Sequence, residues 1–157
     1  MSGMKTFMIL SFAVLQSGRY ITSKGNQTIA TVNGPEKYEI METSFSSVVK
    51  SINELIKSRM VMIEGNEVPL QVFLGAGLKS LLKLMGLSGA TSTGDLLWCK
   101  THKDNRCDMT KTLAFYNSSQ MKRTLQSIKT CSVYSSSQNN YCCIHLPLFE
   151  IELDYPG

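Results

Sequence analysis

A chain of 157 residues, 43% of them apolar, is long enough to bury one hydrophobic core and too short for two comfortable domains. Its net charge of +4 is uneven: residues 79–129 carry nine basic and three acidic side chains, whereas residues 130–157 carry three acidic side chains and no basic one. No apolar run reaches the roughly 20 residues of a membrane-spanning helix, so we expect no membrane partner. The basic middle third is the part suited to a polyanion such as nucleic acid.

The first apolar run, Phe7 to Leu15, has two interpretations. Lys5 precedes it and small residues up to Gly18 follow it, which is typical of a secretory signal. Asn26 and Asn117 begin glycosylation sequons, which fit a secreted chain. Under this interpretation the protein is a small secreted, cysteine-containing binding protein.

The other interpretation is a buried β-strand, since the run has strand length and contains β-branched and aromatic residues. Gln27 to Val32 is then a second short strand, which Asn33-Gly34-Pro35 ends. The turn chemistry of Ser23-Lys24-Gly25-Asn26 between the two strands predicts a hairpin.

The clearest predicted element is a helix from Glu42 to Ser58. Apolar residues recur there at three- and four-residue spacing, as a helix with one buried face requires: Phe45, Val48, Val49, Ile52, Leu55 and Ile56.

A second hairpin is predicted after this helix. Arg59 to Ile63 and Val68 to Leu74 are strand-like, and Gly65-Asn66 between them suits a tight turn with positive φ angles. Gly75-Ala76-Gly77 then ends the second strand, and Leu78 to Met85 has the spacing of a short amphipathic helix. Strands and helices in this order predict an α/β fold, with a sheet covered by helices.

The second half is poorer in regular structure. Residues 88–112 are polar, and residues 130–141 are a Ser, Asn and Gln tract that cannot supply a core, so we expect loops in both. One more helix is expected within Leu113 to Ile128.

The cysteines give little support for a disulfide framework, because their number is odd and two of them are adjacent: Cys99, Cys107, Cys131, Cys142 and Cys143. Cys99, His102 and Cys107 lie close enough in sequence to supply zinc ligands, but only Cys99-Lys100-Thr101-His102 approaches the Cys-x-x-Cys hook that fixes two ligands together. Surface thiols and a solvated histidine explain the same residues without a metal.

The segment from Val68 to Cys99, VPLQVFLGAGLKSLLKLMGLSGATSTGDLLWC, resembles the V(D)J recombinase catalytic subunit and the Transib transposases. Those proteins have a strand that ends in a glycine-rich turn, a metal-binding Asp, a short helix, a Gly-Leu-x-(Ala/Gly)-(Ser/Thr) segment and a Cys-x-x-Cys zinc hook. Gly86 to Ser92 matches the segment before the hook, and Cys99 matches its second cysteine. The resemblance implies an RNase H-like core.

Departures from this family pattern bear on activity. The position of the family's second catalytic Asp falls on Gly77, and the first cysteine of the zinc hook falls on Leu96. By the same resemblance, the first Asp would precede Met1, and the catalytic Glu and the histidine zinc ligands would follow Gly157. The family uses Mg²⁺ or Mn²⁺ on three carboxylates and Zn²⁺ in the hook, whereas we expect no cofactor in this chain.

The predicted fold class is therefore α/β, with a partial RNase H-like mixed sheet and flanking helices over residues 1–90. Residues 91–157 are predicted to be a loop-rich insert with a degenerate zinc hook, of which Cys99 is the metal-ligand remnant, and a Ser/Asn-rich linker. We expect a catalytically inactive, nuclear, recombinase-derived chain whose partners are DNA, bound weakly and without sequence preference, and an intact recombinase relative.

The side chains expected to neutralise DNA phosphates are the basic ones of the middle third. The five main candidates are Lys79, Lys83, Lys100, Lys103 and Arg106. Three further basic residues extend the set: Lys111, Lys122 and Arg123.

Overall fold

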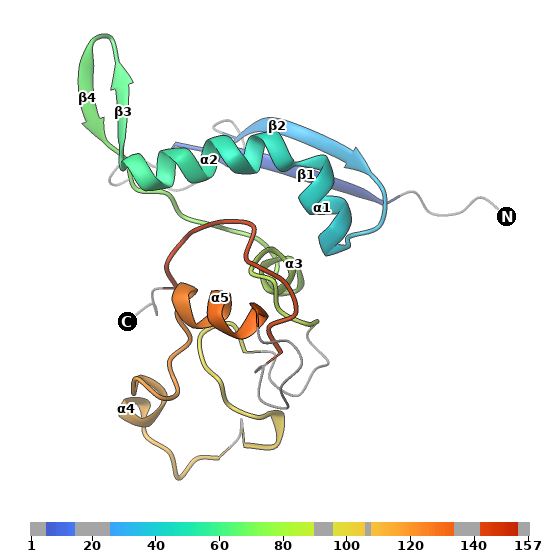
Figure 1. Ribbon diagram of the computed structural model, residues 1–157, viewed down its shortest axis with the longest axis vertical. Helices are drawn as coiled ribbons and strands as arrows, with labels where there is room; N and C mark the ends of the chain where they lie inside the picture. Colours follow the sequence, from blue (N-terminus) through green and yellow to red (C-terminus); the bar gives the residue numbers. More distant parts are fainter. Residues whose placement is uncertain (1–5, 15–25, 90–95, 106–107, 134–141, 154–157) are drawn as a thin grey trace, which may run out of the picture. The chain divides into compact units, whose positions relative to one another are not determined.

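The computed structural model describes residues 6–14, 26–89, 96–105, 108–133 and 142–153 (Figure 1). Within these residues the chain is mixed α/β, and it divides into two compact units, Met1–Lys50 and Ser51–Gly157. We describe each unit separately. Among the described residues, no helix is both long and apolar enough to cross a bilayer.

The first unit begins with an antiparallel pair, β1 (Phe7–Ala13) and β2 (Asn26–Asn33), which confirms the first predicted hairpin (Figure 1). Phe7 pairs with Asn33 at one end, and the register shifts between Leu10 and Ser11. Met8 is buried, whereas Phe7 is 56% exposed. The apolar run therefore forms a strand whose side chains are only partly covered.

The predicted helix at Glu42 to Ser58 forms as two helices, α1 (Tyr38–Ser44) and α2 (Ser46–Ser58). Phe45 separates them, because its φ of −103° and ψ of 9° leave the helical region. Tyr38, Met41 and Phe45 are buried on one face of the first turns. No side chain of α2 is buried, although this helix carries most of the apolar spacing that predicted it.

In the second unit, β3 (Met60–Ile63) and β4 (Asn66–Pro69) form the second hairpin. The turn lies at Glu64 and Gly65, whose φ angles are 51° and 81°, one residue earlier than predicted. One more backbone hydrogen bond follows Pro69, from Leu70 N to Arg59 O at 2.8 Å. The pairing ends there because Arg59 has a φ of 55° and donates its own N–H to Leu55 O in α2. The prediction of a strand that continues to Leu74 was therefore wrong.

The described strands form two separate two-stranded antiparallel sheets, not the single mixed sheet that was expected over residues 1–90. Each strand pairs with its neighbour in sequence, and residues 70–77 after β4 add no further strand. The α/β class is thus confirmed, and the mixed sheet is not seen in the described part of the chain.

Beyond β4 the predicted helix at Leu78 to Met85 is confirmed as α3 (Leu78–Leu84). The helix predicted within Leu113 to Ile128 is confirmed in part by α5 (Leu125–Val133), and a short α4 (Leu113–Tyr116) precedes it. Because α5 continues to Val133, the loop predicted over residues 130–141 was wrong for residues 130–133, and its remainder to residue 141 lies outside the described residues. The described parts of residues 88–112 contain only a short 3-10 helix, η2 (Lys103–Asn105), and single bridges, as expected of loops.

The core of the second unit lies between α3, α5 and the segment 142–149. Its buried side chains come from both sides of residue 90, and Cys131 and Trp98 pack against them: Leu82, Met85, Leu87, Leu97, Leu125, Ile128 and Cys143. The proposed boundary at residue 90 stays a prediction.

The segment 142–149 is held to the end of α3 by backbone hydrogen bonds. Gly86 O accepts from Ile144 N at 2.9 Å and from His145 N at 3.0 Å, and Leu148 N donates to Leu84 O at 2.7 Å. These bonds fix the last described segment against the helix that follows the glycine-rich turn.

Candidate nucleic-acid interface

Gly77, at the position expected for a catalytic Asp, lies at the N-terminus of α3 with φ −61° and ψ 149°. A Cβ atom built there meets no atom within 4 Å. Neither space nor backbone conformation therefore requires glycine, and an aspartate would fit. Among the described residues, no group of three or more His, Cys, Asp or Glu could hold a metal ion. Asp95 lies outside them.

The predicted zinc-hook remnant, Cys99, is half-buried, and its thiol donates to Thr101 Oγ1 at 3.2 Å. Leu96, in place of the first hook cysteine, is also half-buried and offers no ligand atom. His102 Nδ1 lies 3.2 Å from Asp104 Oδ2 in an exposed pair. Cys107, the other nearby thiol, lies outside the described residues.

Arg123 does not belong to the phosphate-binding set, because it is only 1% exposed. Its Nη1 donates to Cys143 Sγ at 3.2 Å, and its Nη2 donates to the Cys99 carbonyl at 3.4 Å. Sequence reasoning could not foresee this burial, since an arginine in a basic stretch is normally solvated.

The Cys143 thiol is itself 1% exposed, and burial raises its pKa to about 11. The guanidinium of Arg123 lowers this pKa to a smaller extent, and the hydrogen-bonded Cys131 thiol raises it further. Cys143 is therefore a neutral thiol at physiological pH and not an activated nucleophile.

The structure brings Lys100 and Lys122 together on adjacent backbone segments. Cys99 and Lys122 form an isolated antiparallel bridge, and Lys100 N donates to Met121 O at 2.9 Å. Both lysine side chains are half-buried. Because side chains alternate along paired segments, Lys122 shares a face with Cys99 and Lys100 lies on the opposite face, so the two cations are close along the backbone without forming one patch.

The other candidate cations lie on separate segments of the second unit. Lys79 is exposed and Lys83 half-buried, both on α3. Lys111 is exposed, with its Nζ 5.1 Å from the centroid of the Phe115 ring. The side chain of Lys103 and all of Arg106 lie outside the described part of the chain.

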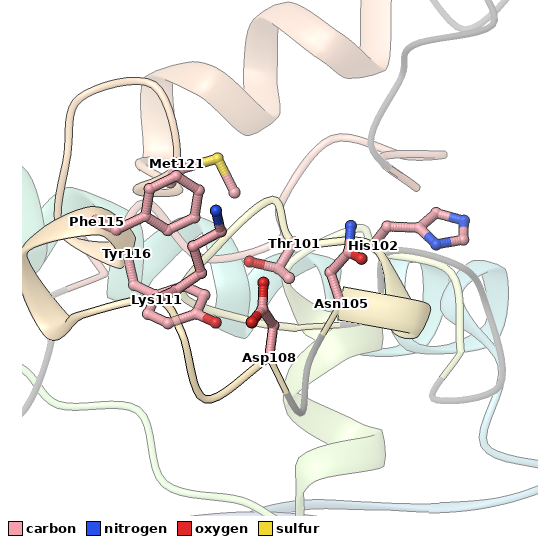
Figure 2. A pocket seen from close by; sticks show the side chains of 8 residues that line it. All are labelled: Thr101, His102, Asn105, Asp108, Lys111, Phe115, Tyr116 and Met121. Carbon is pink, nitrogen blue, oxygen red and sulfur yellow. The ribbon is translucent and has the colours of Figure 1, made fainter.

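A pocket of about 250 Å³ lies beside α4 (Figure 2) and was not predicted from the sequence. We call it the α4 pocket. It combines aromatic, polar and charged side chains from residues 101–121: Thr101, His102, Asn105, Asp108, Lys111, Phe115, Tyr116 and Met121. The signal that could have revealed it is a pair of aromatic residues inside the basic third.

Two features define the chemistry of this pocket. The rings of Phe115 and Tyr116 meet edge to face, with centroids 5.3 Å apart. The Asp108 carboxylate accepts hydrogen bonds from the hydroxyl and the backbone N–H of Thr110, which hold the pKa of Asp108 below its usual range. The pocket therefore joins an aromatic wall to an ionised acceptor.

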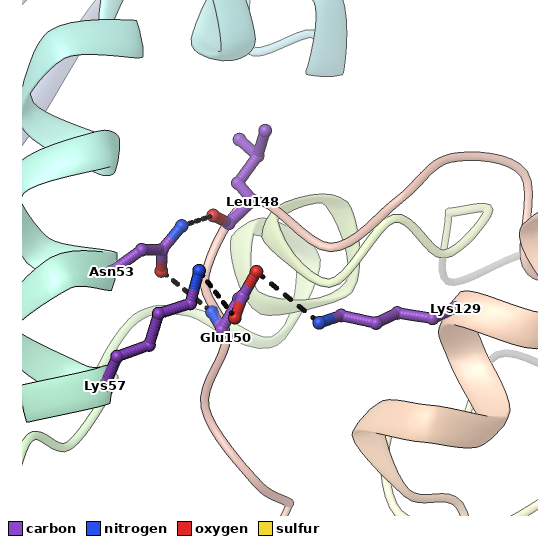
Figure 3. A network of polar contacts seen from close by, with 5 residues as sticks. All are labelled: Asn53, Lys57, Lys129, Leu148 and Glu150. Carbon is purple, nitrogen blue, oxygen red and sulfur yellow. Dashed lines mark hydrogen bonds and ion pairs between the residues drawn. The ribbon is translucent and has the colours of Figure 1, made fainter.

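A separate polar network ties α2 to the last described segment (Figure 3). Asn53 Nδ2 donates to Leu148 O at 2.8 Å, and Asn53 Oδ1 accepts from Glu150 N at 2.9 Å. The Glu150 carboxylate lies 3.4 Å from Lys57 Nζ and 3.5 Å from Lys129 Nζ. Lys129 is thereby occupied by an internal carboxylate.

Comparisons of the chain with protein-family models, with curated proteins and with solved structures gave no match.

Proposed function

We propose that this chain is a catalytically inactive, recombinase-derived protein that binds DNA weakly, through phosphate contacts, in the nucleus. The observation that carries the proposal is the charge of residues 79–129, where basic side chains outnumber acidic ones three to one. Lys100 and Lys122 on adjacent segments, with the exposed Lys111 and Lys79, supply cations to such contacts.

The origin of the chain in an RNase H-like recombinase rests on the sequence resemblance, which is clearest from Val68 to Cys99. Of the expected local order, the helix after the glycine-rich turn is present as α3, whereas β4 ends at Pro69 and does not run into that turn. An intact recombinase relative is then the protein partner that we propose.

Binding without sequence preference follows from the kinds of side chain available. The exposed candidates are lysines, which contact phosphates as point charges, whereas reading of base edges in a duplex needs side chains such as Asn, Gln or Arg on an element that enters the major groove. The affinity should then come from counterion release.

A salt titration tests this proposal. A labelled 20-base-pair duplex is titrated with the full chain at several salt concentrations. If about four lysines contact phosphates, log K should fall with log salt at a slope near −3.6, and scrambled DNA should compete equally well. A salt-insensitive or sequence-selective complex would contradict the proposal, as would the absence of any binding.

A variant pair makes the test specific to the basic third. Changing both Lys100 and Lys122 to Gln should reduce the magnitude of the slope by about 1.8, or roughly 0.9 for each lost contact. The matched control changes Lys37 and Lys50, two exposed lysines of the first unit, to Gln and should leave the slope unaltered.

The inactive state has its own test. Because Gly77 carries no carboxylate, the two-metal chemistry of this class lacks one of its three ligands. We expect no nicking of supercoiled plasmid with Mg²⁺ or Mn²⁺. Metal-dependent nicking that is lost on changing Asp95 to Ala would overturn this part of the proposal.

A further inference from the structure

We propose that the α4 pocket holds one unpaired base of a DNA strand and prefers a base with an exocyclic amine. This inference rests on the proposed function, since DNA binding brings the strand to the pocket, but it adds a contact to the base that phosphate binding does not supply.

The aromatic wall gives the first argument. A pocket of about 250 Å³ is below the usual size of a site for a drug-like molecule and suits a small flat ring. Phe115 is 38% exposed and, with Tyr116, presents ring surface to the pocket. Bases of single-stranded nucleic acids stack on such side chains, whereas bases inside a duplex cannot reach them.

The position of Lys111 gives the second argument. Its ammonium group lies over the Phe115 ring, 5.1 Å from the ring centroid. A base that stacks on this face takes the place of the ammonium group, which is then free to contact the adjoining phosphate. In a nucleotide, the sugar joins a negatively charged phosphate to an aromatic base. In the pocket, Lys111 places a positive charge close to the aromatic ring of Phe115. The ring and the cation together match one nucleotide unit.

The polar side of the pocket selects among bases. In Figure 2 the Asp108 carboxylate is directed toward the middle of the pocket, with Phe115 and Tyr116 on one side and Asn105 and His102 on the other. An ionised carboxylate only accepts hydrogen bonds. It can accept from the N4 amine of cytosine. The one donor on the corresponding edge of thymine, N3–H, lies between O2 and O4, two acceptors that the carboxylate repels.

The carboxylate would oppose binding if it faced the DNA backbone. The excess of basic side chains over residues 79–129 offsets its charge along the strand, so only the base edge needs to meet Asp108. The pocket is therefore proposed as a base site within a stretch of chain whose sequence is basic, with Lys111 as the cation in its lining, and not as an acidic site that excludes DNA.

Fluorescence anisotropy with labelled (dC)12, (dT)12 and the 20-base-pair duplex tests the inference on the full chain. We expect (dC)12 to bind at least about fivefold more tightly than (dT)12, the lower end of one good base-edge contact. Changing Asp108 to Asn should bring the two affinities together, because an amide can pair with either base.

Changing Phe115 to Leu should weaken both single strands by about fivefold or more and leave duplex binding unaltered. Since Phe115 also packs within the protein, Asn105→Trp serves as a second variant: position 105 is exposed and the larger ring would fill the pocket. It should cause the same selective loss of single-strand binding.

The outcomes separate the two proposals. Salt-dependent duplex binding with equal affinities for (dC)12 and (dT)12, unaffected by either pocket variant, overturns the base site and leaves the proposed function standing. Selective (dC)12 binding that both pocket variants abolish, without duplex binding, supports the base site and overturns the proposed duplex contacts. Failure of all three probes to bind overturns both.

Discussion

The carbonyl oxygen of His145 lies so close to Gly86 that it would overlap with the Cβ atom of any other residue at position 86. Gly86 also has a φ of 72°, a left-handed conformation that disfavours other side chains. Its carbonyl oxygen accepts two hydrogen bonds from the segment that contains His145. This glycine therefore allows the end of α3 and the segment 142–149 to pack backbone to backbone.

Changing Gly86 to Ala should lower the free energy of unfolding by about 3 kcal/mol or more, because strain in the backbone and overlap with His145 add together. Chemical denaturation of the purified variant measures this loss. The matched control is Gly77→Ala, where a Cβ meets no atom within 4 Å and φ is −61°. That change should alter stability by less than about 0.5 kcal/mol, and equal effects at both positions would contradict the role assigned to Gly86.

Asn53 and Lys57 both reach the last described segment, but they should differ in their contributions to stability. Asn53 makes two hydrogen bonds to backbone atoms of Leu148 and Glu150, so Asn53→Ala should cost about 1–3 kcal/mol by leaving half-buried polar groups without partners. Lys57 is 64% exposed in its pair with Glu150, so Lys57→Ala should cost less than about 1 kcal/mol.

Urea denaturation at low and high salt separates the two contributions. The Lys57 effect should shrink as salt screens the ion pair, whereas the Asn53 effect should persist. A larger loss for Lys57→Ala than for Asn53→Ala would show that the ion pair, and not the amide, holds the segment.

Zinc should bind at well below one ion per chain. Leu96 removes the partner of Cys99, and one anchored thiolate cannot organise a tetrahedral site. Elemental analysis of protein purified without chelator measures the content, and Cys99→Ser should leave it unaltered. A tight one-to-one content that this variant abolishes would show that the hook still works.

The elements that could be predicted from the sequence are those set by short-range patterns. The apolar run at Phe7 to Ala13 pairs with the next strand, as its length and composition predicted, and Leu78 to Leu84 is helical because its apolar spacing suits no strand. Errors came from single residues: Phe45 divides a helix, and Arg59, with its positive φ angle, ends a ladder. Periodicity averages over such positions and therefore misses them.

The candidate site was harder to predict because it depends on contacts between distant residues. Arg123 is buried by contacts with Cys143 and with the Cys99 carbonyl, 20 and 24 residues away in sequence. Within the α4 pocket, Thr101 and Met121 are brought together by a pairing of backbone segments that no local pattern indicates. Charge counts define the basic third by sequence alone and cannot separate a solvated cation, such as Lys111, from a buried one, such as Arg123.

The buried thiol of Cys143 should make the protein less stable at alkaline pH. Burial raises the pKa of Cys143 from 9.0 to about 11, so above pH 9 the unfolded chain loses this proton while the folded chain keeps it. The folded state then binds more protons than the unfolded state, and stability falls as the pH rises from about 9 to about 11. A shift of this size corresponds to at most about 2.7 kcal/mol.

Urea denaturation in reducing buffer at pH 8, 9, 10 and 11 measures the decline. Burial also raises the pKa of Tyr38 from 10.0 to about 12, so the comparison is made in a Tyr38→Phe background. In that background Cys143→Ala should flatten the decline, because the titrating group is gone, and an equally steep decline with and without Cys143 would show that another group causes it.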